Sequence, residues 1–316
     1  MDSRQHTVQV THVAKRFGKT EAVKDVSFSV EAGEIFGLLG PNGAGKTTTI
    51  RMMMDIFKPD AGSIALFGGP LDMAKKQRIG YLPEERGLYK DQKLEPTLLY
   101  FATLKGVDEK TARIRLNKWL ERLDLAEHRH KKVQELSKGM QQKAQIIATL
   151  LHNPDLVVID EPFAGLDPVN TRLVKQILQE MQAAGKSIIM STHQMYQVEA
   201  MCNRIALLNQ GRTVLYGAVN EIKRNFSGNT ILLEGQGDFA GLPGVLEMRK
   251  HNGAWQLALE IGTNPQHVLQ TLTARADVRL ERFELAEPSL EDIFVHVVGE
   301  RGSLENETAV LETDHA

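Results

Sequence analysis

The sequence predicts an α/β fold in which helices pack against a sheet, with a smaller α/β unit after it. Apolar stretches typical of buried strands alternate with helical stretches through the first two thirds of the chain. The glycine-rich run "GPNGAGKT" (40–47) joins one such strand, "IFGLL", to a helix beginning "TTTIRMMM". A polar break, "RNFSGN" (224–229), separates this part from a second, shorter series of strands and one helix.

The expected elements follow a regular order. Strand patterns occupy 7–17 and 22–40, with Gly33 in a turn between them. A helix is expected over 46–57, and the turn residues at 59–62 close it. Four further elements are expected: a helical insert at 94–126, strands at 156–160 and 187–193, and a helix at about 170–184.

The second unit is expected to span 229–299 and to include a helix near 265–275. No catalytic group of residues is recognisable in it. Residues 300–316, "ERGSLENETAVLETDHA", are acidic and rich in turn formers. We expect this tail to be disordered.

Composition narrows the functional classes. The 316 residues are 42% hydrophobic and 25% charged, with a formal net charge of −2, which argues against an overall electrostatic grip on nucleic acid. Cys202 is the only cysteine, so an intramolecular disulfide and a cysteine zinc site are excluded. No run approaches the ~18 apolar residues of a membrane-spanning helix. We expect a soluble chain in the cytoplasm that cannot itself form a membrane pore.

The run at 40–47 satisfies the phosphate-loop pattern G-x-x-x-x-G-K-[ST] without a mismatch. Gly40, Gly43 and Gly45 allow backbone N–H groups to turn inward around a phosphate. Lys46 is expected to reach the β and γ oxygens, and the Thr47 hydroxyl to ligate magnesium. The sequence therefore predicts a nucleotide site.

Acidic residues end a later apolar strand, "LVVIDEP". Two adjacent carboxylates at a strand tip are costly unless a cation or a proton transfer uses them. We expect Asp160 to belong to the magnesium shell and Glu161 to polarise the attacking water. The alternative is a pair of solvated acids before Pro162. His193 ends the next strand and is expected near the γ-phosphate, because strand ends of a parallel sheet meet at one edge; alone it would more often be a core histidine.

A second anion site is suggested by "ELSKGMQQK" (135–143). Ser137 has the character of a helix N-cap, and Gly139 close behind it exposes backbone N–H groups that attract anions. The residues themselves do not say which anion this helix end holds.

Taken together, "GPNGAGKT", "ELSKGMQQK", "LVVIDEP", "GLDP" and "STH", in this order, resemble the ATP-binding cassette family, the nucleotide-binding subunits of ABC transporters. The resemblance implies a domain at 6–224 with a RecA-like P-loop NTPase core, an antiparallel β subdomain and an α-helical subdomain at about 85–150. It also implies ATP and Mg²⁺ as ligands. Two chains would form a head-to-tail dimer, homomeric or heteromeric, that closes on two ATP molecules.

The resemblance assigns further residues. In this family the signature motif binds the γ-phosphate held by the other subunit, so Ser137 and Gly139 would act in trans. Lys138 and Met140 depart from the family pattern, and Gln141 is the candidate substitute for the missing glutamine. Asp167 matches a loop that communicates between the two sites. The expected ATP contacts are Phe17, Gly40, Pro41, Asn42, Gly43, Ala44, Gly45, Lys46, Thr47 and Thr48.

The loop "GYLPEE" carries a further departure. Glu84 stands where most cassettes have the glutamine that senses magnesium and the membrane subunit. A carboxylate at this position can still ligate metal or accept a hydrogen bond, but it adds negative charge beside the triphosphate.

The combination "GYLPEERGLY", "LSKGM" and "PSLEDIFVHVVG" resembles stand-alone ATPase subunits of bacterial export systems for sodium or antibiotics. This implies a separately encoded integral membrane permease as partner and a place at the cytoplasmic face of the membrane. One alternative is a cassette that transmits force for cell-envelope remodelling. Another is a cassette acting on nucleic acid or ribosomes. The chain has one phosphate loop and one signature motif, which disfavours this alternative. No nucleic acid partner is expected.

Overall fold

The structure is a computed structural model, and it describes residues 6–298 except 86, 227–229, 252, 261, 287 and 296. The chain divides into two compact units, residues 1–218 and 219–316, and each is described by itself. This division places residues 219–226 with the second unit, whereas the domain limits expected from the sequence place most of them with the first. The expected disordered tail, 300–316, lies outside the described residues.

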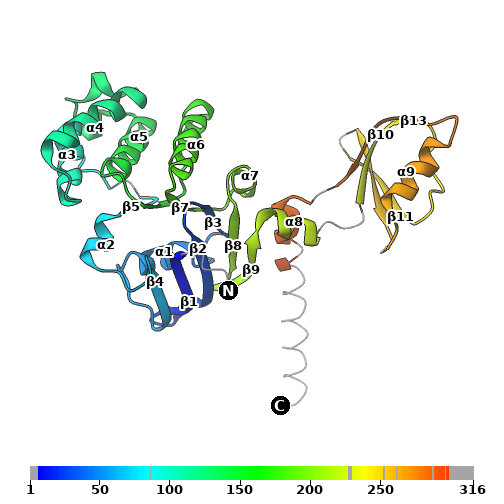
Figure 1. The fold of residues 1–316 in the computed structure, drawn as a ribbon, viewed down its shortest axis with the longest axis horizontal. Coiled ribbons are helices and arrows are strands. Elements are labelled where there is room, and N and C mark those ends of the chain that lie inside the picture. Colours follow the sequence, from blue (N-terminus) through cyan, green and yellow to red (C-terminus); the bar gives the residue numbers. More distant parts are fainter. Residues whose placement is uncertain are drawn as a thin grey trace, which may run out of the picture. The chain divides into compact units, whose positions relative to one another are not determined.

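The first unit is built on a nine-stranded sheet with the order β4-β1-β2-β9-β8-β3-β7-β6-β5 (Figure 1). Its strands are β1 (His6–Phe17), β2 (Thr20–Glu31), β3 (Ile35–Leu39), β4 (Ala61–Leu66), β5 (Ile79–Leu82), β6 (Leu156–Asp160), β7 (Ser187–Thr192), β8 (Arg204–Asn209) and β9 (Arg212–Ala218). Strands β8, β3, β7, β6 and β5 run parallel, whereas β4, β1 and β2 are antiparallel neighbours. This is the expected P-loop core with its antiparallel β subdomain.

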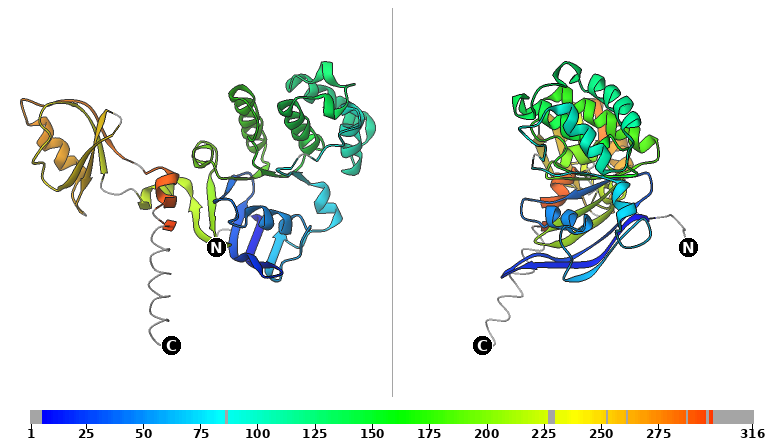
Figure 2. Two further views of the ribbon diagram at one scale, coloured as in Figure 1. Left: turned by 180° about the vertical axis from the view of Figure 1, so that it is seen from behind. Right: turned by 90° about the vertical axis from the view of Figure 1, so that its left-hand side faces the viewer.

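Seven helices of the first unit are described. They are α1 (Lys46–Met53), α2 (Met73–Gln77), α3 (Leu94–Leu104), α4 (Glu109–Arg122), α5 (Lys138–Leu150), α6 (Pro168–Ala183) and α7 (Met195–Glu199), with short 3-10 turns η1 (Ala126–His128) and η2 (Val133–Glu135). Helices α3, α4 and α5 form a group at the β5 edge, away from β1, β2 and β4, in both Figure 1 and Figure 2. This group is the helical subdomain.

Burial explains the apolar runs of the sequence. Every residue of β3, β6 and β7 is buried, as expected for parallel strands covered on both faces. The backbone N–H and C=O groups of such a strand bond to the neighbouring strands. Its side chains face apolar surroundings on both sides, so its sequence is a nearly unbroken hydrophobic run. The polar residues Asp160, Ser191 and Thr192 lie at the carboxyl ends of β6 and β7.

Several elements differ from expectation. The helical insert expected over 94–126 is two helices, because Gly106 takes a left-handed φ of 79° and Asp108 caps the start of α4. The helix expected to reach residue 57 ends at Met53, and Asp55 takes a φ of 61°. Residues 61 and 62, expected in a turn, begin β4, while β5, β8 and β9 were not anticipated.

The second unit contains an antiparallel sheet with the order β11-β12-β10-β13. Its elements are α8 (Val219–Phe226), β10 (Thr230–Gln236), β11 (Val245–His251), β12 (Ala254–Leu259), α9 (Pro265–Thr273) and β13 (Arg279–Leu285). A separate apolar core includes Ile231, Leu233, Leu257, Val268 and Leu272. Among the described residues of both units, no helix combines the length and hydrophobicity needed to span a bilayer.

Candidate nucleotide site

The carboxyl ends of β3, β6 and β7 meet at one edge of the sheet, because these strands are parallel neighbours. A cavity of about 560 Å³ lies there. It is lined by Thr20, Glu21, Ala22, Asn42, Gly43, Gly45, Lys46, Thr47, Thr48, Glu84, Asp160, Glu161 and His193. Ten of the residues predicted from the sequence are thus brought together. Thr20 to Ala22, at the start of β2, were not predicted, and no sequence pattern marks them.

The phosphate loop needs glycine at two positions for a steric reason. Gly40 has a φ of 143°, and a Cβ there would lie 2.2 Å from the Leu208 carbonyl oxygen. Gly45 has a φ of 101°, and its Cβ would lie 2.8 Å from the Ala22 oxygen. A side chain at either position would force the loop away from the sheet.

Lys46 is the first residue of α1 and is almost wholly buried. Its Nζ donates hydrogen bonds to the carbonyl oxygens of Gly40 (2.7 Å) and Pro41 (3.1 Å). Burial lowers the pKa of Lys46, while the negative charges of Glu161, Asp160 and Glu84 oppose this shift. An ammonium group among carboxylates at the mouth of a glycine loop is suited to bind a polyanion.

Asp160 is held in place by two hydroxyl groups. Thr47 Oγ1 donates to Asp160 Oδ2 at 3.0 Å, and Ser191 Oγ donates to Oδ1. A hydroxyl and a carboxylate are hard oxygen ligands of the kind that Mg²⁺ prefers, and this ion usually keeps several waters and binds phosphate oxygens as well. The described residues contain no cluster of three or more His, Cys, Asp or Glu side chains suited to a metal. The donor set therefore fits a magnesium ion bound jointly with a phosphate ligand.

Glu161 lies beside Asp160 and takes a φ of 52°, which is unusual for a residue with a side chain. Its carboxylate accepts hydrogen bonds from Thr192 Oγ1 (3.0 Å) and from the backbone N–H of His193 (3.2 Å). His193 Nδ1 also donates to Glu161 Oε1 at 2.7 Å. The turn conformation thus directs the carboxylate toward β7, where three donors fix it at the cavity.

Comparison with known proteins identifies this arrangement. The family profile "ABC transporter" matches residues 23–164. The chain is 40% identical to the ABC transporter ATP-binding protein YhaQ of Bacillus subtilis (strain 168), over 92% of this chain and 98% of that protein. The chain belongs to the ABC transporter ATP-binding proteins. This ABC ATPase therefore binds ATP and hydrolyses it in the service of transport.

Other matches agree with this assignment. The ABC ATPase is 32% identical to the linearmycin resistance ATP-binding protein LnrL of Bacillus subtilis (strain 168), over 92% of this chain and 98% of that protein. A solved structure of an ATP-binding subunit of an ABC transporter superposes with a TM-score of 0.66 at 33% identity, covering 70% of this chain and 93% of that chain. Residues 217–298 match the profile of the C-terminal domain of DrrA1-3-like ATP-binding proteins.

The remaining predicted residues lie outside the cavity lining of the ABC ATPase. Gly40, Pro41 and Ala44 belong to the phosphate loop but do not line the cavity. Phe17 ends β1 and packs edge to face on Phe57, with ring centres 5.1 Å apart. Asp167 is the N-cap of α6 and accepts hydrogen bonds from the N–H groups of Val169 (2.9 Å) and Asn170 (3.0 Å). Hydrogen bonds from Asn170 lower the pKa of Asp167.

The signature residues are also separate from the cavity. Ser137 is the N-cap of α5, and its Oγ accepts from the Met140 N–H at 3.2 Å. Gln141 Nε2 donates to the carbonyl oxygens of Val133 (3.2 Å) and Leu136 (2.9 Å), so its donors are used within its own chain. Ser137 and Gly139 do not line the cavity formed by Lys46.

Proposed function

We propose that this ABC ATPase is the ATP-hydrolysing subunit of an export system and that it drives a separately encoded membrane permease from the cytoplasmic face. One observation carries the proposal. The loop after β5 joins two hollows, because Glu84 lines the nucleotide cavity while Pro83, Gly87 and Leu88 line a second pocket. A protein seated in the second pocket would touch the same short loop that reaches the nucleotide.

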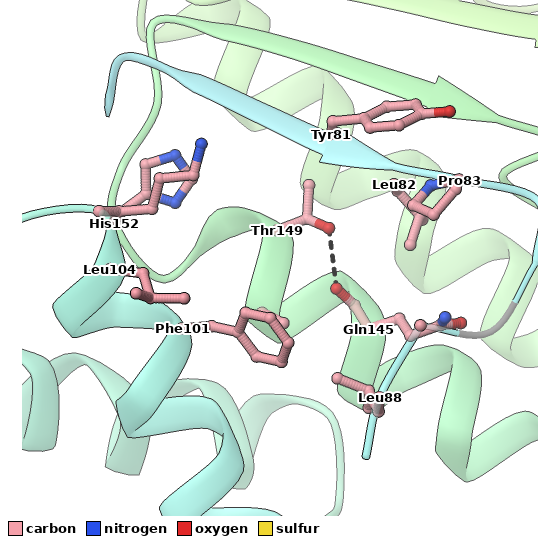
Figure 3. A pocket seen from close by; sticks show the side chains of 12 residues that line it. Tyr81, Leu82, Pro83, Leu88, Phe101, Leu104, Gln145, Thr149 and His152 are labelled. Atoms are coloured by element: carbon pink, nitrogen blue, oxygen red, sulfur yellow. Dashed lines mark hydrogen bonds between the residues drawn. The ribbon is translucent and has the colours of Figure 1, made fainter. Parts of the chain in front are cut away.

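The second pocket is largely apolar and lies between β5, α3 and α5 (Figure 3). Around it, Tyr89, Tyr100 and Leu104 are exposed on the helical subdomain. Exposed aromatic and aliphatic side chains beside an apolar hollow are typical of a protein interaction site. Two kinds of relatives, the linearmycin resistance protein and the Nod factor export proteins, support export as the direction of transport.

At the nucleotide cavity, Lys46 would bind the β and γ phosphates, and Thr47 and Asp160 would hold Mg²⁺. The ion would neutralise phosphate charge. Glu161 would polarise the attacking water as general base, with His193 orienting the Glu161 carboxylate near the γ-phosphate. Ser137 and Gly139 would complete the site of a second subunit through the open N–H groups at the start of α5.

The test uses the multi-span membrane protein that co-purifies with the tagged wild-type chain. Its addition in lipid vesicles should stimulate ATP hydrolysis by the wild-type chain. Leu104→Glu places a charge at the rim of the apolar pocket and should abolish stimulation while leaving basal hydrolysis intact. The control is Ile114→Glu, at a similarly exposed apolar residue of α4 outside the pocket lining, and this variant should behave as wild type.

If the permease still stimulates the Leu104→Glu variant, the pocket is not part of the interface with the permease. Co-purification of ribosomes or nucleic acid in place of a membrane protein would overturn the proposed function. A membrane protein that stimulates hydrolysis but moves no solute would favour cell-envelope remodelling.

A further inference from the structure

The helical subdomain carries a group of basic residues that the nucleotide site does not use. Two segments contribute to it, residues 90–93 before α3 and residues 129–132 between η1 and η2. Together they contain five lysines or arginines and one aspartate, a formal charge of +4, whereas the whole chain has a formal net charge of −2. This part of the surface is therefore strongly basic on a chain that is slightly acidic.

Backbone pairing holds the two segments side by side. Lys93 and Lys132 are partners in an antiparallel bridge, and the Leu94 N–H donates to the Lys131 carbonyl oxygen at 2.9 Å. The Cβ atoms of residues opposite each other in such a bridge lie about 4.5–5.5 Å apart, and like charges there are destabilising. The fold thus places one ammonium-bearing side chain opposite another, at a cost in stability that a bound polyanion would relieve.

The acidic groups nearby do not neutralise these lysines. Glu95 is engaged by Arg129, with Oε2 and Nε 3.2 Å apart, and Glu135 accepts a hydrogen bond from the backbone N–H of Lys132 at 2.7 Å. Asp91 forms no ion pair with any residue that the structure describes. The same holds for four exposed lysines, which we call the lysine cluster: Lys90, Lys93, Lys131 and Lys132.

The neighbours of the lysine cluster favour a membrane surface over nucleic acid. Tyr89, directly before Lys90, is 54% exposed, and its ring stacks on Phe101 of α3 with centres 6.0 Å apart. Tyr100 of α3 is also exposed. Tyrosine rings beside basic side chains are typical of the boundary between water and lipid, where one end of the ring is apolar and the other wet. Domains that hold nucleic acid by charge usually carry an overall positive excess, which this chain lacks.

We propose that the lysine cluster binds the anionic headgroups of phospholipids, so that the helical subdomain contacts the lipid surface itself. This goes beyond the proposed function, in which the permease alone holds the ATPase at the membrane. Groups of four or more lysines or arginines are of the size that recognises anionic lipids, and each lysine near such a surface raises membrane affinity by about 5-fold.

The first experiment measures flotation of the full chain with vesicles of phosphatidylcholine, with or without phosphatidylglycerol, that contain no permease. Wild type should bind only the vesicles with phosphatidylglycerol, and binding should weaken as salt is raised. Replacing the opposed pair, Lys93→Gln with Lys132→Gln, should weaken binding by about 10- to 30-fold.

The control, Lys110→Gln with Lys118→Gln, removes the same charge from two exposed positions of α4 and should bind as wild type. All variants should keep basal ATP hydrolysis, which reports an intact fold. No binding to anionic vesicles, undiminished binding of the opposed-pair variant, or an equal loss in both double variants would overturn the proposal.

Two further arms separate lipid from other polyanions. Tighter binding to polyuridylate RNA than to vesicles, lost in the opposed-pair variant, would assign the lysine cluster to nucleic acid and overturn the lipid assignment. In the complex with the permease, reconstituted in phosphatidylcholine alone, this variant should be stimulated like wild type. Weaker stimulation there would show that the lysines contact the permease instead. Because the vesicle arm contains no permease, its outcome stands even if the proposed function fails.

Discussion

The backbone conformation and the side-chain hydrogen bonds of Glu161 together fix the position of its carboxylate. Its left-handed φ and its three hydrogen-bond donors place the carboxylate at the edge of the nucleotide cavity. Glu161→Gln preserves the shape of this side chain but removes its ability to take a proton. ATP binding should be retained, and hydrolysis should fall by about 10²–10⁴-fold. Steady-state ATPase rates and nucleotide trapping measure the two effects, and near-normal turnover would exclude Glu161 as the general base.

Glu84 is one of four carboxylate residues that line the cavity, together with Glu21, Asp160 and Glu161. Its charge acts on Lys46, so it lies within electrostatic reach of a bound triphosphate. Glu84→Gln removes this charge with little change of shape. ATP affinity should hold or rise, and stimulation by the permease should change.

The control for Glu84 is its neighbour. Glu85→Gln removes the same charge one residue further along, outside the cavity lining. If Glu84→Gln and Glu85→Gln both leave nucleotide affinity and stimulation as in wild type, Glu84 is an ordinary surface residue and its alignment with the family glutamine is wrong.

The sequence predicted the residues that follow buried strands better than those brought in by tertiary pairing. Asp160 and His193 come directly after apolar runs, so their meeting at one edge follows from parallel strands. Thr20 and its neighbours reach the cavity because Gly45 packs against Ala22, a contact that no local pattern encodes.

At the scale of elements, hydrophobic runs located β3, β6 and β7 but not β5, β8 or β9. β3, β6 and β7 are buried throughout and could be read from composition. β9 contains only half-buried and exposed residues, and it acquires its strand conformation by pairing with β8. The split of the helical insert depends on one glycine with positive φ, a conformation that glycine permits but does not require.

Asp167 caps a helix and is also the residue predicted to communicate between the two nucleotide sites of a dimer. It caps α6 through two backbone N–H groups, so Asp167→Ala should lower the free energy of unfolding by about 1 kcal/mol. Asp167→Ser keeps a capping oxygen and should retain most of this stability, as measured by urea unfolding. If Asp167 also links the two sites of a dimer, Asp167→Ser should reduce ATPase activity without loss of stability. Unchanged activity in the serine variant would limit Asp167 to its capping role.

At the scale of the whole molecule, we propose that one chain carries two unlike phosphate-binding features. The cavity around Lys46 has a phosphate loop, oxygen ligands and a positioned carboxylate, yet neither Ser137 nor Gly139 lines it. Ser137 instead caps an exposed helix start on the helical subdomain. Two chains arranged head to tail would bring each Ser137 to the other's Lys46, which is the dimer that the family resemblance implies.

Mixed dimers test this arrangement directly. When wild type is paired with a chain carrying both Lys46→Ala and Ser137→Ala, each trans site has one broken half and no intact site remains. When a Lys46→Ala chain is paired with a Ser137→Ala chain, one site collects both lesions and the other keeps both good halves. The second dimer should therefore trap nucleotide and the first should not, with trapping preferred to turnover because hydrolysis could require two working sites. If each site formed within a single chain, this order would reverse, because the wild-type subunit of the first dimer would have an intact site. Equal or reversed trapping would therefore rule out Ser137 as a residue that binds the partner's nucleotide.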